Sequence, residues 1–382
     1  MKMEFDTKVI HAAIKPDPDT GSIVTPIHQS ATYAMEKVGQ DKGYDYTRSA
    51  NPTREIMEDH LAVLDNGKFG IAFASGMAAI DSSLKLLKSG DHVICSDNVY
   101  GGTYRLFDQL LVNYGLHFSF VDTSFPKEVE KAITPKTKMI WVETPTNPLL
   151  KITDLNAISK IAKKNNLLFA VDSTFSTPVF LKPLDFGADL VMHSTTKYIT
   201  GHSQLIGGIL ITNKEDLANK LKFAQKTIGA IPSPFDCWLT LLGVKTLDVR
   251  MKKHEQNAIK VAEFLNSHSK ISSLTYPGLS SHPMHHIAKE QMKGFSGMIS
   301  FELKGGAKAG KKFLNSVKLA LLAESLGSVE TMVLHPASMT HGDVPKEFRL
   351  SHGFSDGLVR ISVGIENVDD IINDFKQALD KV

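Results

Sequence analysis

Lys197 is the residue around which a chemical site can be built from this sequence. It follows hydroxyl residues, among them Ser194 and Thr196, after the apolar run Asp189-Leu-Val-Met-His193, and a glycine loop comes next. A lysine held where a buried strand ends can give up its proton, and its neutral amine can then condense with an aldehyde. Most lysines are solvated surface charges, so a chemical role for Lys197 needs support from neighbouring residues.

A carboxylate occupies the same kind of position in a second apolar run. Leu167-Leu-Phe-Ala-Val171 is followed by Asp172. An acid beside the nitrogen of a pyridine ring keeps that nitrogen protonated, so the ring can draw electrons from a substrate carbon. An amine and an acid at two strand ends therefore predict a site for pyridoxal phosphate (PLP).

A third strand end offers a place for the phosphate of such a cofactor. The run from Phe69 to Ala74 predicts a strand that ends at Ser75, and Gly76 to Leu87 predicts the helix that follows. The N-terminus of a helix points free N–H groups at one spot, where a phosphate binds. A serine and a glycine before a helix are also an ordinary cap, so this feature counts only together with Lys197 and Asp172.

The chain resembles the Cys/Met metabolism family of PLP-dependent enzymes, the group of cystathionine gamma-lyase, cystathionine gamma-synthase, cystathionine beta-lyase and methionine gamma-lyase. The resemblance implies PLP as the cofactor and the fold type I of PLP-dependent transferases, like that of aspartate aminotransferase. It rests on motifs that run in the family's order over nearly the whole chain. These motifs are Tyr44-Asp-Tyr-Thr-Arg-Ser-Ala-Asn-Pro-Thr53, Ser75-Gly-Met77, Val99-Tyr-Gly-Gly102, Glu143-Thr-Pro-Thr-Asn-Pro148, Asp172, Ser194-Thr-Thr-Lys-Tyr198, Glu324-Ser-Leu-Gly327, His335-Pro-Ala-Ser-Met-Thr-His341 and Val359-Arg-Ile-Ser-Val-Gly-Ile-Glu366.

The resemblance also implies a role for each residue of the site. Lys197 holds the cofactor covalently and transfers protons, while Tyr100 stacks on the cofactor ring and assists. Arg360 binds the alpha-carboxylate of an amino-acid substrate. The catalytic residues are then Lys197, Tyr100 and Asp172. The cofactor ligands are Gly76, Met77, Tyr100, Asp172, Ser194, Thr196, Lys197, Tyr46 and Arg48. The substrate ligands are Arg360, Ser325, Asn147, Glu324 and Tyr46.

The residues by themselves leave several of these roles open. Tyr100 also fits a half-buried packing position, and Ser194 and Thr196 also fit a cap of the turn that follows them. Arg360 lies inside an apolar strand, where an unpaired charge is costly. A structural salt bridge and a substrate clamp explain Arg360 equally well.

Residues 1–50 are rich in proline, aspartate, glycine and threonine and predict an extended arm rather than a part of the core. From composition alone, Tyr46 and Arg48 at the end of this arm belong to a solvated loop. In the resembling enzymes the arm crosses to a neighbouring subunit, where these two residues hold the phosphate of the partner's cofactor. The resemblance thus implies a homo-oligomer, as a homotetramer built from two dimers.

The elements that must position the site divide into two units. Residues 51–245 alternate apolar strands with amphipathic helices and predict a large PLP-binding domain, an α/β fold with a doubly wound, mostly parallel sheet. Ligands should gather at the carboxyl ends of its strands. Residues 246–382 predict a smaller α+β C-terminal domain, in which strands at 297–303 and 358–363 each have one solvated face. A long helical pattern from Pro234 toward Phe264 links the two domains.

Composition and charge limit which partners and which cellular compartment we expect for this protein. The formal net charge of the 382 residues is +2 and no basic block is interleaved with aromatics, so we expect a small-molecule sulfur amino acid and no nucleic-acid partner. No apolar run is long enough to span a membrane and the charged start is unlike a secretory signal, which predicts a cytoplasmic protein.

Cys95 and Cys237 predict buried thiols rather than a disulfide. His282, His285 and His286, on an apparent surface segment, match no zinc spacing, so we expect no metal.

Within the family, the details favour a gamma-lyase. Glu324 is shared by the resembling gamma-lyases and gamma-synthases, whereas methionine gamma-lyases usually carry an apolar residue there. Residues 133–143 and 231–238 also look more like gamma-lyases. We therefore expect alpha,gamma-elimination of L-cystathionine to L-cysteine, 2-oxobutyrate and ammonia in transsulfuration. Whether hydrogen sulfide is also released from cysteine or homocysteine stays open.

Other interpretations stay open as well. Cystathionine gamma-synthase, which joins an O-acyl-homoserine to cysteine, is the main alternative, followed by methionine gamma-lyase and cystathionine beta-lyase. A PLP-binding protein without activity is the alternative outside catalysis. A dinucleotide-dependent dehydrogenase shares the sheet class, but no GxGxxG follows the first strand. Two departures from the family pattern, Ser173 and Gln204, fall near the expected cofactor, where rate or specificity can shift.

Overall fold

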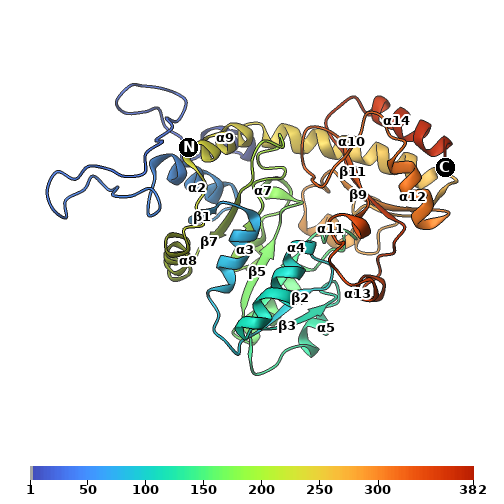
Figure 1. The fold of residues 1–382 in the computed structure, drawn as a ribbon, viewed down its shortest axis with the longest axis horizontal. Helices are drawn as coiled ribbons and strands as arrows, with labels where there is room; N and C mark the ends of the chain where they lie inside the picture. Colours follow the sequence, from blue (N-terminus) through green and yellow to red (C-terminus); the bar gives the residue numbers. More distant parts are fainter. Residues whose placement is uncertain (1–2) are drawn as a thin grey trace.

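Two β-sheets form the framework of the computed structural model, which describes residues 3–382 (Figure 1). The larger sheet has seven strands in the order β1-β7-β6-β5-β4-β2-β3. Within this sheet β7 alone runs antiparallel to its neighbours, so the other strands end on the same side. The predicted doubly wound, mostly parallel sheet is confirmed. Its strands are β1 (Phe69–Phe73), β2 (His92–Ser96), β3 (His117–Val121), β4 (Thr137–Glu143), β5 (Leu168–Asp172), β6 (Leu190–His193) and β7 (Gly208–Thr212).

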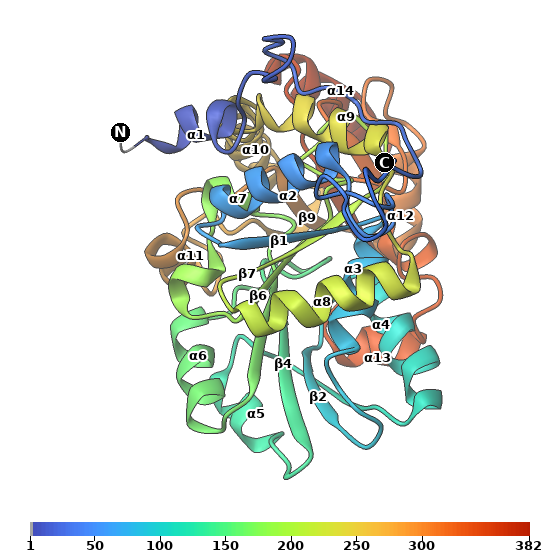
Figure 2. The ribbon, with the colours of Figure 1, turned by 90° about the vertical axis from the view of Figure 1, so that its left-hand side faces the viewer.

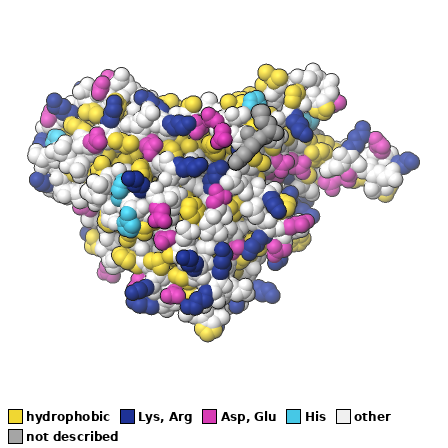
Figure 3. All heavy atoms as spheres, turned by 180° about the vertical axis from the view of Figure 1, so that it is seen from behind, with side chains coloured by type: hydrophobic (Ala, Val, Ile, Leu, Met, Phe, Trp, Pro, Cys, Tyr) yellow, Lys and Arg dark blue, Asp and Glu magenta, His cyan; other side chains and the backbone are white. Residues whose placement is uncertain are grey.

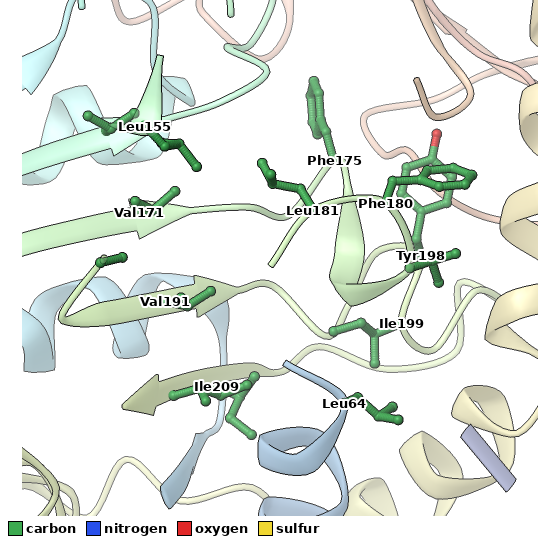
Figure 4. Close-up of a cluster of buried hydrophobic side chains, with 14 of the residues drawn as sticks. Leu64, Leu155, Val171, Phe175, Phe180, Leu181, Val191, Tyr198, Ile199 and Ile209 are labelled. Carbon is green, nitrogen blue, oxygen red and sulfur yellow. The ribbon is translucent and has the colours of Figure 1, made fainter. Parts of the chain in front are cut away.

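Helices cover both faces of the large sheet, which explains why most of its strands are apolar throughout. The helices are α2 (Pro52–Leu64), α3 (Gly76–Leu84), α4 (Gly101–Tyr104), α5 (Pro126–Lys131), α6 (Leu155–Lys164), α7 (Thr177–Phe180), α8 (Glu215–Ile228) and α9 (Pro234–Val244). Along β4, Ile140 packs toward the layer of α6, whereas Trp141 packs toward the layer of α3. Figure 2 shows α6 on one side of the sheet and α3 and α4 on the other. Figure 4 shows the core on the α6 side, with Leu155 and Val171 in one buried cluster.

A second, smaller sheet lies in the last third of the chain, in the order β10-β11-β12-β9-β8. Its strands are β8 (Ile271–Thr275), β9 (Met298–Leu303), β10 (Leu321–Leu322), β11 (Met332–Leu334) and β12 (Leu358–Ser362), and its helices are α10 (Leu247–Ser267), α11 (His285–Gln291), α12 (Gly306–Leu314), α13 (Lys346–Ser351) and α14 (Val368–Asp380). The predicted solvated faces of β9 and β12 are wrong, because this sheet lies between its own helices and the large unit. Val359 packs with the helices. Arg360 and its cross-strand partner Ser300 instead contact the large unit.

Two further predictions about connections need correction. The N-terminal segment is not all extended, because α1 (Phe5–His11) packs its buried Val9 against α2. The following segment up to residue 50 does project from the body (Figure 1), and residues 1–2 of the predicted arm lie outside the described residues. The long helical pattern from Pro234 is two helices, α9 and α10, with a break at Lys245 and Thr246.

The remaining predictions concern the surface, the two cysteines and the histidines near residue 282. Figure 3 shows positive and negative side chains intermixed on one face. No helix within residues 3–382 is long and apolar enough to cross a bilayer. Cys95 and Cys237 are buried free thiols, as predicted. His282 does not lie on a solvated segment: it is buried, and its Nε2 atom is 3.0 Å from the Leu150 carbonyl oxygen. Over the same described range, no group of three or more His, Cys, Asp and Glu side chains is placed to hold a metal.

Candidate active site

A cavity of about 330 Å³ lies where the carboxyl ends of the large-sheet strands meet the small unit. Strands β1, β4, β5 and β6 end on this side because only β7 is reversed, and β12 approaches from the opposite side. Most of the sequence-predicted site residues line this one cavity. They are Gly76, Met77, Tyr100, Asn147, Asp172, Ser194, Thr196, Lys197, Glu324, Ser325 and Arg360.

Lys197 enters the cavity from the turn that follows β6. Its Nζ atom lies 3.3 Å from the Ser325 Oγ atom, which belongs to the small unit. Burial lowers the pKa of Lys197 to about 8, and the positive charge of Arg360 contributes to this shift. An ammonium group that sheds its proton this readily is a usable nucleophile and base near neutral pH.

Asp172 ends β5 inside the same cavity. Its Oδ1 atom accepts hydrogen bonds from the Thr174 amide at 3.0 Å and the Thr174 hydroxyl at 2.6 Å. Burial raises the pKa of Asp172, while the bonds from Thr174 oppose this shift. Thr174 Oγ1 also accepts from the Ser194 amide at 2.9 Å, so it ties Asp172 to the turn that carries Lys197. The departure at Ser173 leaves this link intact.

Arg360 is buried on β12 and is held only by neutral groups among residues 3–382. Its Nη1 atom donates to Asn147 Oδ1 at 2.9 Å, and its Nη2 atom donates to the Ser325 carbonyl oxygen at 3.0 Å. Its Nε atom has no partner within the described part of the chain. The structure thus gives no support to the structural salt bridge. A buried guanidinium with a free N–H group fits a ligand carboxylate that enters the cavity.

The turn from β1 into α3 can receive a phosphate. A Cβ atom at Gly76 would lie 3.1 Å from both Cβ and Oγ of Ser194, so the helix start and that hydroxyl are close together. The Ser75 side chain caps only the Ala78 amide, at 3.0 Å. The remaining N–H groups and the helix dipole favour an anion. Thr196 fits less directly, because its hydroxyl already exchanges hydrogen bonds with the Gly207 backbone.

Tyr46 and Arg48 do not line the cavity of their own chain. Arg48 Nη1 donates to the Lys226 carbonyl oxygen at 2.6 Å, and its guanidinium lies 5.5 Å from the centre of the Tyr46 ring. Both side chains are exposed on the projecting segment. Tyr100, in contrast, lines the cavity and keeps 38% of its surface exposed.

Sequence reasoning missed Glu143, which ends β4 beside Asp172. Its Oε2 atom accepts the Tyr100 amide at 2.9 Å, and its Oε1 atom accepts the Asn147 amide at 3.0 Å. Burial, and then the Asp172 carboxylate, raise the pKa of Glu143 well above its usual range. The signal was available, since Glu143 follows an apolar strand just as Asp172 does.

Two charged residues of the cavity lining were also missed. Arg105 and Asp343 form an ion pair, with Nη1 and Oδ2 2.5 Å apart, and both side chains are exposed. Arg105 lies just after α4, and Asp343 lies in the loop before α13. No local pattern joins residues so far apart in sequence, so only the assembled fold reveals the pair.

Comparisons with known proteins agree with this geometry. The family model of Cys/Met metabolism PLP-dependent enzymes matches residues 6–380. Cystathionine gamma-lyase of Bacillus subtilis is 50% identical over 380 residues, with 100% of both chains covered. Cystathionine beta-lyase of Coxiella burnetii is also 50% identical over 380 residues, covering 99% of this chain and 98% of the relative. The solved structure of cystathionine gamma synthase from Xanthomonas oryzae, in complex with aminoacrylate and cysteine, has a TM-score of 0.97 at 41% identity, covering 100% of this chain and 99% of that one.

Proposed function

The chain belongs to the Cys/Met metabolism family of PLP-dependent enzymes, and we propose that it is a cystathionine gamma-lyase. The proposed reaction cleaves L-cystathionine to L-cysteine, 2-oxobutyrate and ammonia. The observation that carries the proposal is the Nε–H group of the buried Arg360, which has no partner among residues 3–382 and lies in the same cavity as the Lys197 amine. A fixed cation beside a reactive amine selects an amino acid through its alpha-carboxylate.

When bound, PLP supplies an aldehyde that condenses with amines and a ring that withdraws electrons from the alpha carbon. We assign its phosphate to the N-terminus of α3, at Gly76 and Met77, with the Ser194 hydroxyl beside it. Asp172 is assigned to the ring nitrogen. Thr174 holds the Asp172 carboxylate in place, and a carboxylate beside the ring nitrogen keeps that nitrogen protonated. Tyr100, at the cavity edge, is assigned to stack on the ring.

Lys197 is assigned the proton transfers. Its neutral Nζ atom takes the proton from the alpha carbon, and the same atom moves protons onward so that the gamma sulfur leaves as a thiol. The lowered pKa of about 8 supports this role, because a neutral amine is needed at working pH. The Ser325 hydroxyl, 3.3 Å from Nζ, orients the amine.

Charges at the cavity edge support a substrate that has a second amino-acid end. Glu324 and Asp343 are acidic and Arg105 is basic, and all three line the cavity. Cystathionine carries an ammonium group and a carboxylate beyond its sulfur, so both signs of charge have a partner. Methionine carries neither group beyond its sulfur. This comparison favours cystathionine over methionine as the substrate.

The runner-up is a cystathionine gamma-synthase, which the similarity to the Xanthomonas oryzae structure favours. The test gives purified holoenzyme L-cystathionine alone and, separately, an O-acyl-homoserine with L-cysteine. Release of 2-oxobutyrate and cysteine from the first mixture supports the lyase. Cystathionine formed only in the second mixture overturns it in favour of the synthase. Pyruvate and homocysteine from the first mixture overturn it in favour of a beta-lyase, the activity of the Coxiella burnetii relative.

We further propose that two subunits complete each site, within a homotetramer built from two dimers. Tyr46 and Arg48 stand outside the cavity of their own chain, on a segment that projects from the body (Figure 1). In this proposal they hold the cofactor phosphate of the neighbouring subunit. The corresponding division of the chain is an arm at 1–50, a PLP-binding domain at 51–245 and a small domain at 246–382.

A further inference from the structure

Glu143 joins two loops that carry different parts of the candidate site. The loop after β2 carries Tyr100, and the loop after β4 carries Asn147. Each loop donates one backbone N–H group to a different oxygen of the Glu143 carboxylate, at 2.9 Å and 3.0 Å. Both oxygens of the carboxyl group are therefore used as acceptors at the same time.

The second loop passes this restraint on to the small unit. Asn147 Oδ1 accepts the hydrogen bond from Arg360 Nη1 at 2.9 Å. Ser300, opposite Arg360 on β9, donates to the carbonyl oxygen of Pro148, the next residue in that loop. The position of the guanidinium therefore depends on the 144–148 loop, and that loop depends on Glu143.

We infer that Glu143 is a positioning residue that sets Tyr100 and Arg360 together, so that the cofactor ring and the substrate carboxylate are held in one fixed relation. Glu143 acts through the Tyr100 amide on one side and through Asn147 on the other. The inference rests on the proposed roles of Tyr100 and Arg360. A purely structural glutamate would instead stabilise the fold without separate effects on cofactor and carboxylate binding.

The test substitutes Glu143→Gln, which keeps the shape but replaces one acceptor oxygen by an NH₂ donor. Two dissociation constants are measured from visible absorbance on the PLP-loaded protein, for L-alanine and for ethylamine, which lacks the carboxylate. A third constant is measured for PLP binding to the apo-protein. Since a buried N–H group left without its acceptor costs about a factor of ten or more, we expect L-alanine and PLP each to bind about tenfold more weakly. Ethylamine should change by less than about twofold relative to the PLP-loaded wild type, because it does not use Arg360.

Two further variants separate the possible outcomes. Asn147→Ala removes the link to Arg360 together with a side chain of the cavity lining, so it should weaken the binding of L-alanine more than the binding of PLP. If Glu143→Gln does not fold, Glu143→Asp takes its place, because the shorter side chain keeps the carboxyl group but cannot reach both backbone N–H groups. Glu255→Gln is the matched control, because Glu255 also accepts a backbone N–H group, from Phe295 at 2.7 Å, but does not line the cavity. It should change none of the three constants.

Arg360→Lys shows whether a failure concerns the inference or the site itself. If Arg360→Lys weakens the binding of L-alanine but Glu143→Gln does not, the inference about Glu143 is wrong and the proposed site stands. If Arg360→Lys also leaves L-alanine unchanged, the assignment of the carboxylate clamp is wrong. Equal weakening of L-alanine and ethylamine by Glu143→Gln overturns the inference in favour of a structural role.

Discussion

The Nζ atom of Lys197 lies 3.3 Å from the Oγ atom of Ser325, although 128 residues separate them in the chain. Lys197 follows β6 of the large sheet, and Ser325 lies in the loop between β10 and β11 of the small sheet. The approach depends on Gly327, which has a φ of +76° and packs against the Tyr198 backbone. The amine and its hydrogen-bond partner therefore come from different units, so this contact forms only when both units are assembled.

Gly327→Ala should lower the free energy of unfolding by about 1–3 kcal/mol. The added Cβ atom would lie 2.6 Å from the Tyr198 amide nitrogen, and the positive φ adds backbone strain. Urea unfolding measures the effect. Gly21→Ala is the control, because Gly21 has a similar φ of +72° but open space around it. Equal losses in the two variants would show that the close approach does not matter.

PLP added to the apo-protein should become attached to Lys197 at a rate that rises with pH through about 8. Burial disfavours the ammonium form, so the neutral amine appears well below the ordinary lysine pKa of 10.5. Stopped-flow absorbance gives the rate. Borohydride reduction and peptide mapping should place the label on Lys197, and Lys197→Ala should carry none. A label on another peptide would contradict the site.

Glu324→Gln should lower kcat/KM for L-cystathionine by about fivefold, because the exposed carboxylate no longer attracts the ammonium group beyond the sulfur. The same variant should change kcat/KM for L-homocysteine by less than about twofold, since this substrate has no second amino-acid end. Parallel assays of 2-oxobutyrate measure both values. An equal loss with both substrates would remove Glu324 from the recognition of that end.

Subunits that carry Lys197→Ala should rescue subunits that carry Arg48→Ala. Each variant alone should be nearly inactive if Arg48 serves the neighbouring site. In a mixed dimer one site has both wild-type residues, so random mixing should restore about a quarter of the wild-type activity. Co-expression with two affinity tags isolates the mixed oligomers. No activity in the mixed oligomers would contradict the crossing of the arm.

The free energy of unfolding should decrease as the pH falls from about 6.5 to about 4, in part because of His254. Burial lowers the pKa of His254 from 6.5 to about 4. Between these values the unfolded chain binds a proton that the folded chain does not. The free energy of unfolding therefore falls by about 1.4 kcal/mol for each pH unit. Urea unfolding at several pH values should show a flatter profile for His254→Gln than for the wild type. Parallel profiles would indicate that the pKa of His254 is the same in the folded and unfolded chain, and thus that burial does not lower it.

Much of the fold could be predicted from local pattern. The apolar runs at 69–74, 167–171 and 189–193 located β1, β5 and β6 to within about one residue, because strands buried on both faces are apolar throughout. The same reasoning failed for β12, where Arg360 was read as part of a strand with a solvated face. Burial of that face depends on the large unit packing over it, which no local pattern contains. Val9 was missed for the same reason, since α1 gains its partners only by packing against the distant helices α2 and α10.

What the sequence by itself determined are the residue types at the strand ends and their order. Lys197 and Asp172 follow apolar runs, and parallel strands bring such ends to one edge of a sheet. Only the tertiary structure decided which N–H group of Arg360 lacks a partner within the described part of the chain and that Glu143 joins two loops. It also decided that Tyr46 and Arg48 lie outside the cavity of their own chain. Strand ends follow from short-range periodicity, whereas hydrogen-bond partners depend on atoms brought together from distant parts of the chain.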